Sequence, residues 1–145
     1  MLAVASGGGH IQQLALLAPA FAGADTLYAT PRTDMAERKQ LGPAVPLRDC
    51  SLGAPVHALV CGLQLLVLIA RHRPDLVVTT GAMPGLLALA IGRLFGARTV
   101  WIDSIANAEA LSGSGRFARH FADHWLTQWT QLATVSGPSF RGAVV

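Results

Sequence analysis

Residues 2–14 read LAVASGGGHIQQL, which is a short apolar run, three glycines, and then apolar residues at helical spacing. The run Leu2–Ala5 predicts a buried strand, and the recurrence of apolar side chains from His10 to Phe21 predicts a helix. Glycines between two such segments are typical of a tight connection. The chain therefore begins with a predicted βα unit whose turn is rich in glycine.

A second unit of this kind lies in the middle of the chain, where residues 75–85 read DLVVTTGAMPG. Its β-branched residues predict a strand over Asp75–Thr80, and its proline predicts the start of a helix over Pro84–Phe95. The apolar stretch Val56–Ala70 predicts another helix. Further strands are predicted at Asp25–Ala29, Ala44–Leu47, Arg98–Asp103, His124–Gln128 and within Phe140–Val145, with a solvated connector at Pro31–Gln40, a loop at Ser104–Ser114 and a short helix at Gly115–Phe121.

Strands that alternate with helices along a whole chain indicate a parallel sheet, because parallel neighbours must be joined by crossovers. The predicted fold class is α/β, a Rossmann-like, mainly parallel sheet with helices on both faces. At 145 residues the chain has the length of one ordinary domain, so we expect residues 1–145 to form a single unit.

The composition points to a partner or a membrane. Hydrophobic residues make up 52% of the sequence and charged residues only 13%, against about a quarter in typical soluble domains. Ten of the eleven basic residues are arginine, which suits phosphate groups, but the net charge of +3 forms no run, so no nucleic-acid partner is expected. Two cysteines without a C-x-x-C pattern and no signal peptide indicate a cytoplasmic protein.

Ligands of such sheets bind beyond the carboxyl ends of the strands, so the segments Ser6–His10, Thr80–Gly85 and Asp103–Asn107 are expected to converge. The first two are glycine-rich and open helices, where free backbone N–H groups and the helix dipole attract phosphate oxygens. Two such loops suggest a diphosphate, although glycines in tight turns are the simpler explanation for each loop alone.

Other nucleotide sites fit the sequence poorly. The pattern G-G-G-H-I-Q lacks the third glycine of a dinucleotide loop, and Ala29-Thr30 replaces the acid that NAD enzymes need; Arg32 is the one feature in favour of such an oxidoreductase. A phosphate-binding G-x-x-x-x-G-K-[ST] loop is absent from the sequence. His120 and His124 have the spacing of a metal pair but fall where helix gives way to strand, so neither a metal nor a cofactor is predicted.

Two residues are candidates for proton transfer. His10 stands in the first turn of its helix, where the dipole favours a neutral imidazole that accepts protons; the alternative is a histidine bonded to a loop carbonyl. Asp103 ends a strand beside Ser104 and Asn107 and could activate a hydroxyl, or could instead cap the turn that follows.

The stretch from Leu52 to Ala70 is long and apolar, but Pro55, His57, Gly62 and Gln64 interrupt it, so it predicts a buried or interfacial helix rather than a membrane span. Its polar residues form one narrow stripe, which leaves much of the helix apolar. We expect this apolar helix and the basic helix at Gly115–Phe121 to form a membrane or partner surface, although core packing and a solvated face are the simpler interpretations. The residues of this predicted surface are Val56, Leu63, Val67, Arg116 and Arg119.

Three motifs in order resemble one family: S-G-G-G-H-x-x-Q-L at Ser6–Leu14, D-L-V-V-T-T-G-A-x-P-G at Asp75–Gly85, and W-I-D-S-I-A-N at Trp101–Asn107. The chain looks like the polysaccharide-biosynthesis glycosyltransferase subunits related to the membrane-anchoring subunit of dolichyl-diphosphate N-acetylglucosamine transferase. The likeness covers nearly the whole chain.

That resemblance implies the N-terminal, acceptor-side half of a split GT-B glycosyltransferase. A separate small protein resembling a GT-B C-terminal half would supply most contacts to a UDP-sugar donor, expected to be UDP-N-acetylglucosamine. The acceptor would be a lipid-diphosphate-linked saccharide. The residues facing its diphosphate would be Gly7, Gly8, Gly9, Thr80, Gly81, Pro84 and Gly85.

Many relatives begin with a hydrophobic anchor, whereas here the first strand starts at Leu2. We therefore expect peripheral attachment to the inner face of the cell membrane through apolar helices and arginines. The alternative function is a non-catalytic membrane adaptor or stabiliser of a transferase.

Overall fold

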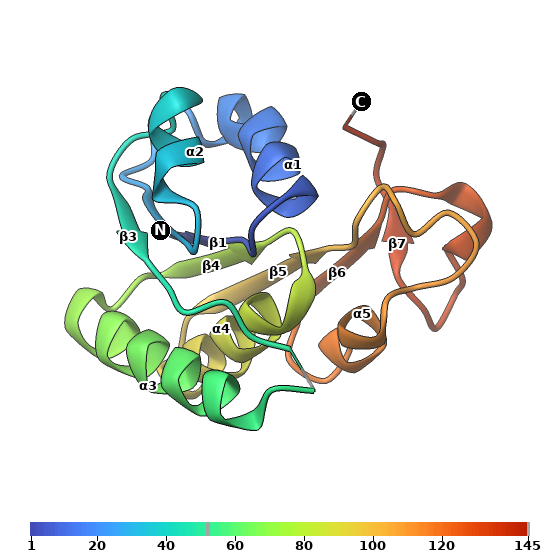
Figure 1. Cartoon of the computed structure of the whole chain (residues 1–145). Coiled ribbons are helices and arrows are strands. Elements are labelled where there is room, and N and C mark those ends of the chain that lie inside the picture. The colour runs from blue at the N-terminus through green and yellow to red at the C-terminus, as the bar shows by residue number, and fades with distance from the viewer. Residues whose placement is uncertain (52, 145) are drawn as a thin grey trace.

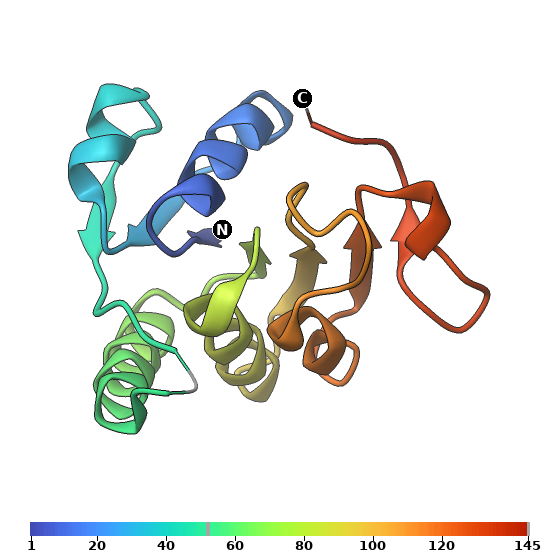
Figure 2. The same ribbon diagram turned by 45° about the vertical axis from the view of Figure 1, so that its right-hand side comes forward.

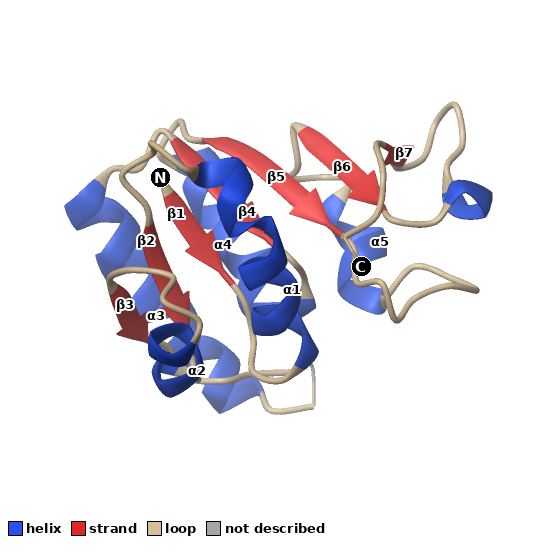
Figure 3. Cartoon of the chain, turned by 90° about the horizontal axis from the view of Figure 1, so that it is seen from above, coloured by secondary structure: helices blue, strands red, loops and turns tan. Residues whose placement is uncertain are grey.

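Seven parallel strands form one sheet in the order β3-β2-β1-β4-β5-β6-β7. The computed structural model describes residues 1–51 and 53–144, so part of the predicted strand in 140–145 and the first residue of the apolar stretch lie outside the described residues. The strands run side by side in one direction (Figure 3). Their bounds are β1 Leu2–Val4, β2 Leu27–Thr30, β3 Ala44–Pro46, β4 Leu76–Thr79, β5 Arg98–Ile102, β6 His124–Thr127 and β7 Ser139–Phe140.

Helices cover both faces of this sheet, as the α/β prediction requires. Helices α1 (Gly9–Leu17) and α2 (Thr33–Arg38) lie on one face, and α3 (Pro55–His72), α4 (Ala82–Leu94) and α5 (Gly113–Ala118) lie on the other (Figures 1 and 2). Two short 3-10 helices, η1 (Ala18–Phe21) and η2 (Thr130–Leu132), complete the chain. The sequence prediction of a Rossmann-like, parallel arrangement is confirmed.

Several predicted boundaries need correction. The first helix stops being α-helical at Leu17 and continues as η1, because Pro19 has no N–H to continue the α-helical ladder. The connector Pro31–Gln40 is mostly exposed, as predicted, but it contains the short helix α2, which was not predicted. The last strand comes earlier than predicted, at Ser139–Phe140.

The core lies mainly between the sheet and the α3–α4 layer. Trp101 of β5 and Cys61, Leu65 and Ile69 of α3 are fully buried in one cluster. The glycine at position 92 lets α4 approach β4, since a Cβ there would lie 2.7 Å from Cγ2 of Val77. Close helix–strand packing fixes where α4 begins and thus where its N-terminus points.

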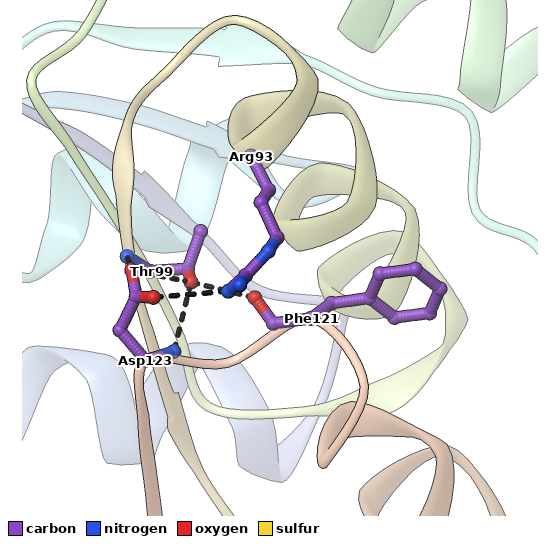
Figure 4. A network of polar contacts seen from close by, with 4 residues as sticks. All are labelled: Arg93, Thr99, Phe121 and Asp123. Atoms are coloured by element: carbon purple, nitrogen blue, oxygen red, sulfur yellow. Dashed lines mark hydrogen bonds and ion pairs between the residues drawn. The ribbon is translucent and has the colours of Figure 1, made fainter.

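A polar network closes the end of the sheet opposite the carboxyl ends (Figure 4). The Asp123 carboxylate accepts hydrogen bonds from the Thr99 backbone N–H at 2.8 Å and from Arg93 Nη1 at 2.9 Å. The Thr99 hydroxyl donates to the Phe121 carbonyl at 2.6 Å. These bonds tie the start of β6 to the start of β5, at the point where the sequence switches from helix to strand.

Candidate functional site

The strand order reverses direction at the β1–β4 pair, where Val4 is in register with Thr79. The chain leaves β1 towards β2 and leaves β4 towards β5, so the two connections diverge above their strands. Ligands of such sheets bind at this position, which we call the crevice. The loops that follow β1 and β4 border this crevice from neighbouring positions. This placement agrees with the predicted convergence of Ser6–His10 and Thr80–Gly85.

The first loop exposes backbone amides. Gly8 is the N-cap of α1 with φ +70°, a conformation that side chains disfavour, and both Gly8 and Gly9 are exposed. The first-turn N–H groups of Gly9, His10 and Ile11 have no intrahelical acceptor. The helix has no acidic residue in its first turn to occupy them. This end of α1 is therefore open to an anion.

The second loop differs from the prediction in detail. Gly81, the N-cap of α4, adopts φ +128°, but its N–H already donates to Thr79 Oγ1 at 3.1 Å. Pro84 has no N–H, and a Cβ on buried Gly85 would lie only 2.0 Å from Thr79 Oγ1. Gly85 thus serves helix packing, and the free amides of this turn belong to Ala82 and Met83.

Ala82 itself has φ +63°, which is uncommon for a residue with a side chain. Such backbone conformations cost free energy and are concentrated where proteins bind ligands. Here the conformation lies between Gly81 and the first amides of α4, so it determines the direction in which those amides point.

His10 joins the two loops. Its Nδ1 lies 2.8 Å from the Thr80 carbonyl, and the Thr80 hydroxyl donates to the His10 carbonyl at 2.8 Å. A carbonyl can only accept, so Nδ1 carries the proton and the lone pair of the neutral ring is at Nε2. Across the described residues no hydrogen-bond partner occupies Nε2. Both predictions for His10, a carbonyl-bonded ring and a possible proton acceptor, fit this geometry.

Asp103 is placed differently. Its carboxylate is buried and accepts from Trp101 Nε1 (3.1 Å), the Ser112 hydroxyl (2.9 Å), Asn107 Nδ2 (3.1 Å) and the Ser112 backbone N–H (3.3 Å). Ser104 Oγ accepts from the Ala106 N–H within the same loop. With four donors and almost no exposed surface, the carboxylate holds the 104–112 loop, which favours the capping role over that of a base.

Arg32, which the sequence offered only as support for an oxidoreductase, lies beside the first loop of the crevice. A Cβ on Gly7 would lie 3.3 Å from Arg32 Cγ, so the arginine lines the first glycine loop. Its guanidinium pairs with both carboxylate oxygens of Asp34 at 2.9 Å, and these hydrogen bonds hold the Asp34 pKa at about 2. The signal that could have located it is a basic residue in the turn just after the second strand, which ends at Thr30.

The surface of α3 is apolar where it faces away from the core. Val56, Leu63 and Val67 are 70%, 53% and 66% exposed. An apolar groove runs between this surface and α4, lined by Leu59, Gly62, Leu63, Leu66, Leu87 and Ile91 among others. Two residues of the polar stripe contact Arg48 while staying exposed: Gln64 Oε1 accepts the Arg48 N–H at 2.7 Å, and His57 Nε2 lies 2.9 Å from Arg48 Nη2.

Length and hydropathy alone would allow α3 to cross a membrane, but its inner side is part of the core, so in this structure it is an element of the domain. On the same side of the sheet, α5 carries Arg116 and the exposed Phe117, and Arg119 is its C-cap. These side chains and Trp125 line one pocket. Within residues 1–51 and 53–144, no three His, Cys, Asp or Glu side chains gather as metal ligands would.

The sequence is similar to one described protein family and to one curated relative. The family model described as "Oligosaccharide biosynthesis protein Alg14 like" matches residues 33–144. Over 74 aligned residues the chain is 36% identical to the mouse (Mus musculus) protein named UDP-N-acetylglucosamine transferase subunit ALG14, and the match covers 45% of this chain and 33% of the mouse protein.

Among solved structures, the chain is similar to MurG of Acinetobacter baumannii, with a TM-score of 0.76 at 14% identity, over 96% of this chain and 45% of that one. It is also similar to a UDP-N-acetylglucosamine 2-epimerase, with a TM-score of 0.64 at 13% identity, over 90% of this chain and 42% of that one. The chain thus spans less than half of each protein, and the fold expected for the N-terminal half of a GT-B enzyme is confirmed.

Proposed function

Because the chain belongs to the Alg14-like family of oligosaccharide biosynthesis proteins, we propose that it is the acceptor-side half of a two-component UDP-N-acetylglucosamine transferase. The observation that carries this proposal is the crevice between the β1 and β4 loops. Two helix N-termini open there, and the imidazole that joins the loops keeps Nε2 free.

In the proposed reaction, a hydroxyl of a lipid-diphosphate-linked saccharide attacks the anomeric carbon of UDP-N-acetylglucosamine. The bond from that carbon to the UDP oxygen breaks as the new glycosidic bond forms, and configuration inverts. The hydroxyl proton passes to Nε2 of His10, while Nδ1–H stays bonded to the Thr80 carbonyl at 2.8 Å. The Thr80 carbonyl thereby orients the ring and stabilises the imidazolium that forms.

The acceptor diphosphate is the ligand that best fits the paired loops. The amides of Gly9 and His10 on one side, and those of Ala82 and Met83 on the other, supply preorganised donors for phosphate oxygens. Arg32 beside Gly7 adds one guanidinium, although Asp34 neutralises part of its charge. A ligand that bridges both loops explains why two such turns face one crevice.

The donor and the partner follow from the proposed division of the enzyme. The mouse relative is named a subunit, and we infer that a small partner with the fold of a GT-B C-terminal half binds most of the UDP-sugar. The active-site cleft would then form between the two proteins, with the crevice of this chain as its acceptor side. A non-catalytic adaptor remains the second candidate, favoured by the exposed apolar surface of α3.

The same surface suggests where the complex works. We infer peripheral attachment to the inner face of the cell membrane, with Val56, Leu63 and Val67 entering the lipid boundary. Arg116 and Arg119 lie on the same side of the sheet and would contact anionic headgroups. Such attachment would bring the protein to the membrane in which a lipid-linked acceptor resides.

The catalytic proposal is tested with the complex that co-purifies through a tag on this chain. Transfer from radiolabelled UDP-N-acetylglucosamine to a lipid extract of the source cells is measured for wild type and His10→Ala. We expect a loss of about 10²- to 10⁴-fold in kcat for His10→Ala with the partner still bound. His124→Ala, which changes an exposed histidine at the opposite end of the sheet, is the matched control. Unchanged turnover in His10→Ala supports the adaptor instead.

Membrane attachment is tested separately by flotation with vesicles containing anionic phospholipid. Leu63→Ser should lower the bound fraction, whereas Leu16→Ser, which changes an equally exposed leucine of α1 on the other face, should not. Equal binding of both variants would contradict a membrane role for α3.

A further inference from the structure

The Asp103 backbone carbonyl accepts hydrogen bonds from two buried glutamines. Gln13 Nε2 donates to it at 3.3 Å and Gln128 Nε2 donates to it at 2.9 Å. Both side chains are only 4% exposed. Gln13 belongs to α1 and Gln128 follows β6 directly, so this one oxygen connects elements that are distant in sequence.

The other ends of both amides are also used. Gln13 Oε1 accepts the Ile105 N–H at 3.2 Å, and Gln128 Oε1 accepts the Val144 N–H at 2.9 Å. The Ile105 carbonyl in turn accepts from Trp129 Nε1 at 2.8 Å. The Asp103 N–H still donates to the Leu126 carbonyl of β6 at 2.9 Å, and beyond it side chains hold this backbone at three points, the Asp103 carbonyl and the N–H and carbonyl of Ile105.

Gln13 occupies a position that helical spacing would assign to an apolar residue, between buried Ile11 and Leu14. A buried amide costs free energy unless its donor and acceptor are both satisfied. Here both are satisfied by loop backbone, one turn of helix after His10. The glutamine therefore fixes the distance between the helix that carries His10 and the loop that follows β5.

We propose that Gln13 and Gln128 are positioning residues that hold the Asp103–Asn107 loop as the third wall of the acceptor crevice. This inference rests on the proposed function, because it assigns the loop to acceptor binding. Neither glutamine touches the reacting atoms. Both glutamines act through the Asp103 carbonyl, and Gln128 also links the loop to the C-terminal segment by accepting the Val144 N–H.

Hydrogen exchange of the backbone amides tests the holding role directly. Gln13→Leu should speed exchange at Ile105 by about tenfold, because that N–H loses its acceptor. Gln128→Leu should do the same at Val144. Gln12→Leu, which changes the exposed neighbour on α1, is the matched control and should leave both amides unchanged. Gln13→Met, unbranched and of equal length, gives the same readout if the leucine variant does not fold.

A variant that changes both glutamines tests whether they act together through the Asp103 carbonyl or independently of each other. Either single variant leaves the Asp103 carbonyl one donor, whereas Gln13→Leu with Gln128→Leu leaves it none. Exchange across 103–107 should therefore rise by more than the product of the two single effects. Unchanged exchange at Ile105, or effects that simply multiply, would overturn the proposal.

Kinetics of the co-purified complex test the acceptor assignment. Gln13→Leu should raise the KM for the lipid extract roughly fivefold to tenfold and leave the KM for UDP-N-acetylglucosamine within about twofold, a split that plain destabilisation would not produce. Faster exchange with an unchanged acceptor KM would refute the positioning role. A wild-type complex that transfers no sugar contradicts the proposed function, while the exchange data still decide whether the glutamines hold the loop.

Discussion

Gly81→Ala tests the contact between the two loops of the crevice. The backbone at Gly81 has φ +128° and ψ −165°, a region that residues with a Cβ adopt only at a cost of about 1–3 kcal/mol. The new Cβ would also lie 2.8 Å from Cε1 of His10, so the imidazole must move. Losing its bond to the Thr80 carbonyl adds about 0.5–1.5 kcal/mol. We expect the free energy of unfolding to fall by about 1.5–4.5 kcal/mol.

Urea unfolding followed by tryptophan fluorescence measures this loss, and two comparisons isolate its cause. Gly96→Ala also places a Cβ on a residue with positive φ (+82°), but this Cβ would meet nothing within 4 Å, so the variant should cost only about 1–2 kcal/mol. In a His10→Ala background, Gly81→Ala should cost about 1 kcal/mol less than in wild type, because the clash is gone. If Gly81→Ala costs the same in both backgrounds, the imidazole does not lie against Gly81 and the described crevice is wrong.

Three further predictions concern packing, pH and thiol chemistry. Gly85→Ala places a Cβ 2.0 Å from Thr79 Oγ1 in the buried sheet and should lower the urea midpoint by the equivalent of about 1–3 kcal/mol; a loss below about 0.5 kcal/mol would contradict this packing. Hydrogen bonds from the Thr99 backbone lower the pKa of Asp123, so its contribution to stability is complete above the unfolded pKa of about 3.9 and is lost as pH falls through the folded pKa. In urea titrations at a series of acid pH values, Asp123→Asn should therefore lose less stability on acidification than wild type. An equal loss in both proteins would refute the assignment. Burial raises the pKa of Cys61 to about 12, so iodoacetamide at about pH 8 should modify Cys61 only after unfolding, and similar rates in the native chain would disprove its burial.

The order of strands and helices could be predicted from the sequence because each element carries its own pattern. The β-branched run after Asp75 and the glycines at 7–9 and 81 determine a parallel alternation without reference to any distant contact. The resemblance to the glycosyltransferase subunits rested on the same motifs and is confirmed by the family match over residues 33–144. Hydrophobic patterns and glycine turns were therefore sufficient to predict the order of the strands and helices.

Other features depend on contacts between segments that the sequence does not place together. Gly85 looks like part of a phosphate loop until Thr79 is found against it, and Asp103 looks free until its four donors are located. Gly115 is required because a Cβ there would lie 2.5 Å from Asp103 Oδ1, a contact between loop and helix that no spacing reveals. The roles of these residues became visible only with the tertiary structure.

The pairing of β1 with β4 also has a consequence for how the protein is made. Leu2 is in register with Val77, so during synthesis β1 leaves the ribosome long before β4, its second neighbour in the sheet, exists. Parallel pairs of such wide separation form slowly, because the loop between them must be closed first. During synthesis the chain from β1 to α3 thus holds an unpaired strand edge and an apolar helix, the features through which nascent chains associate wrongly. Chaperones or early contact with a membrane surface would have their greatest effect on yield in this interval.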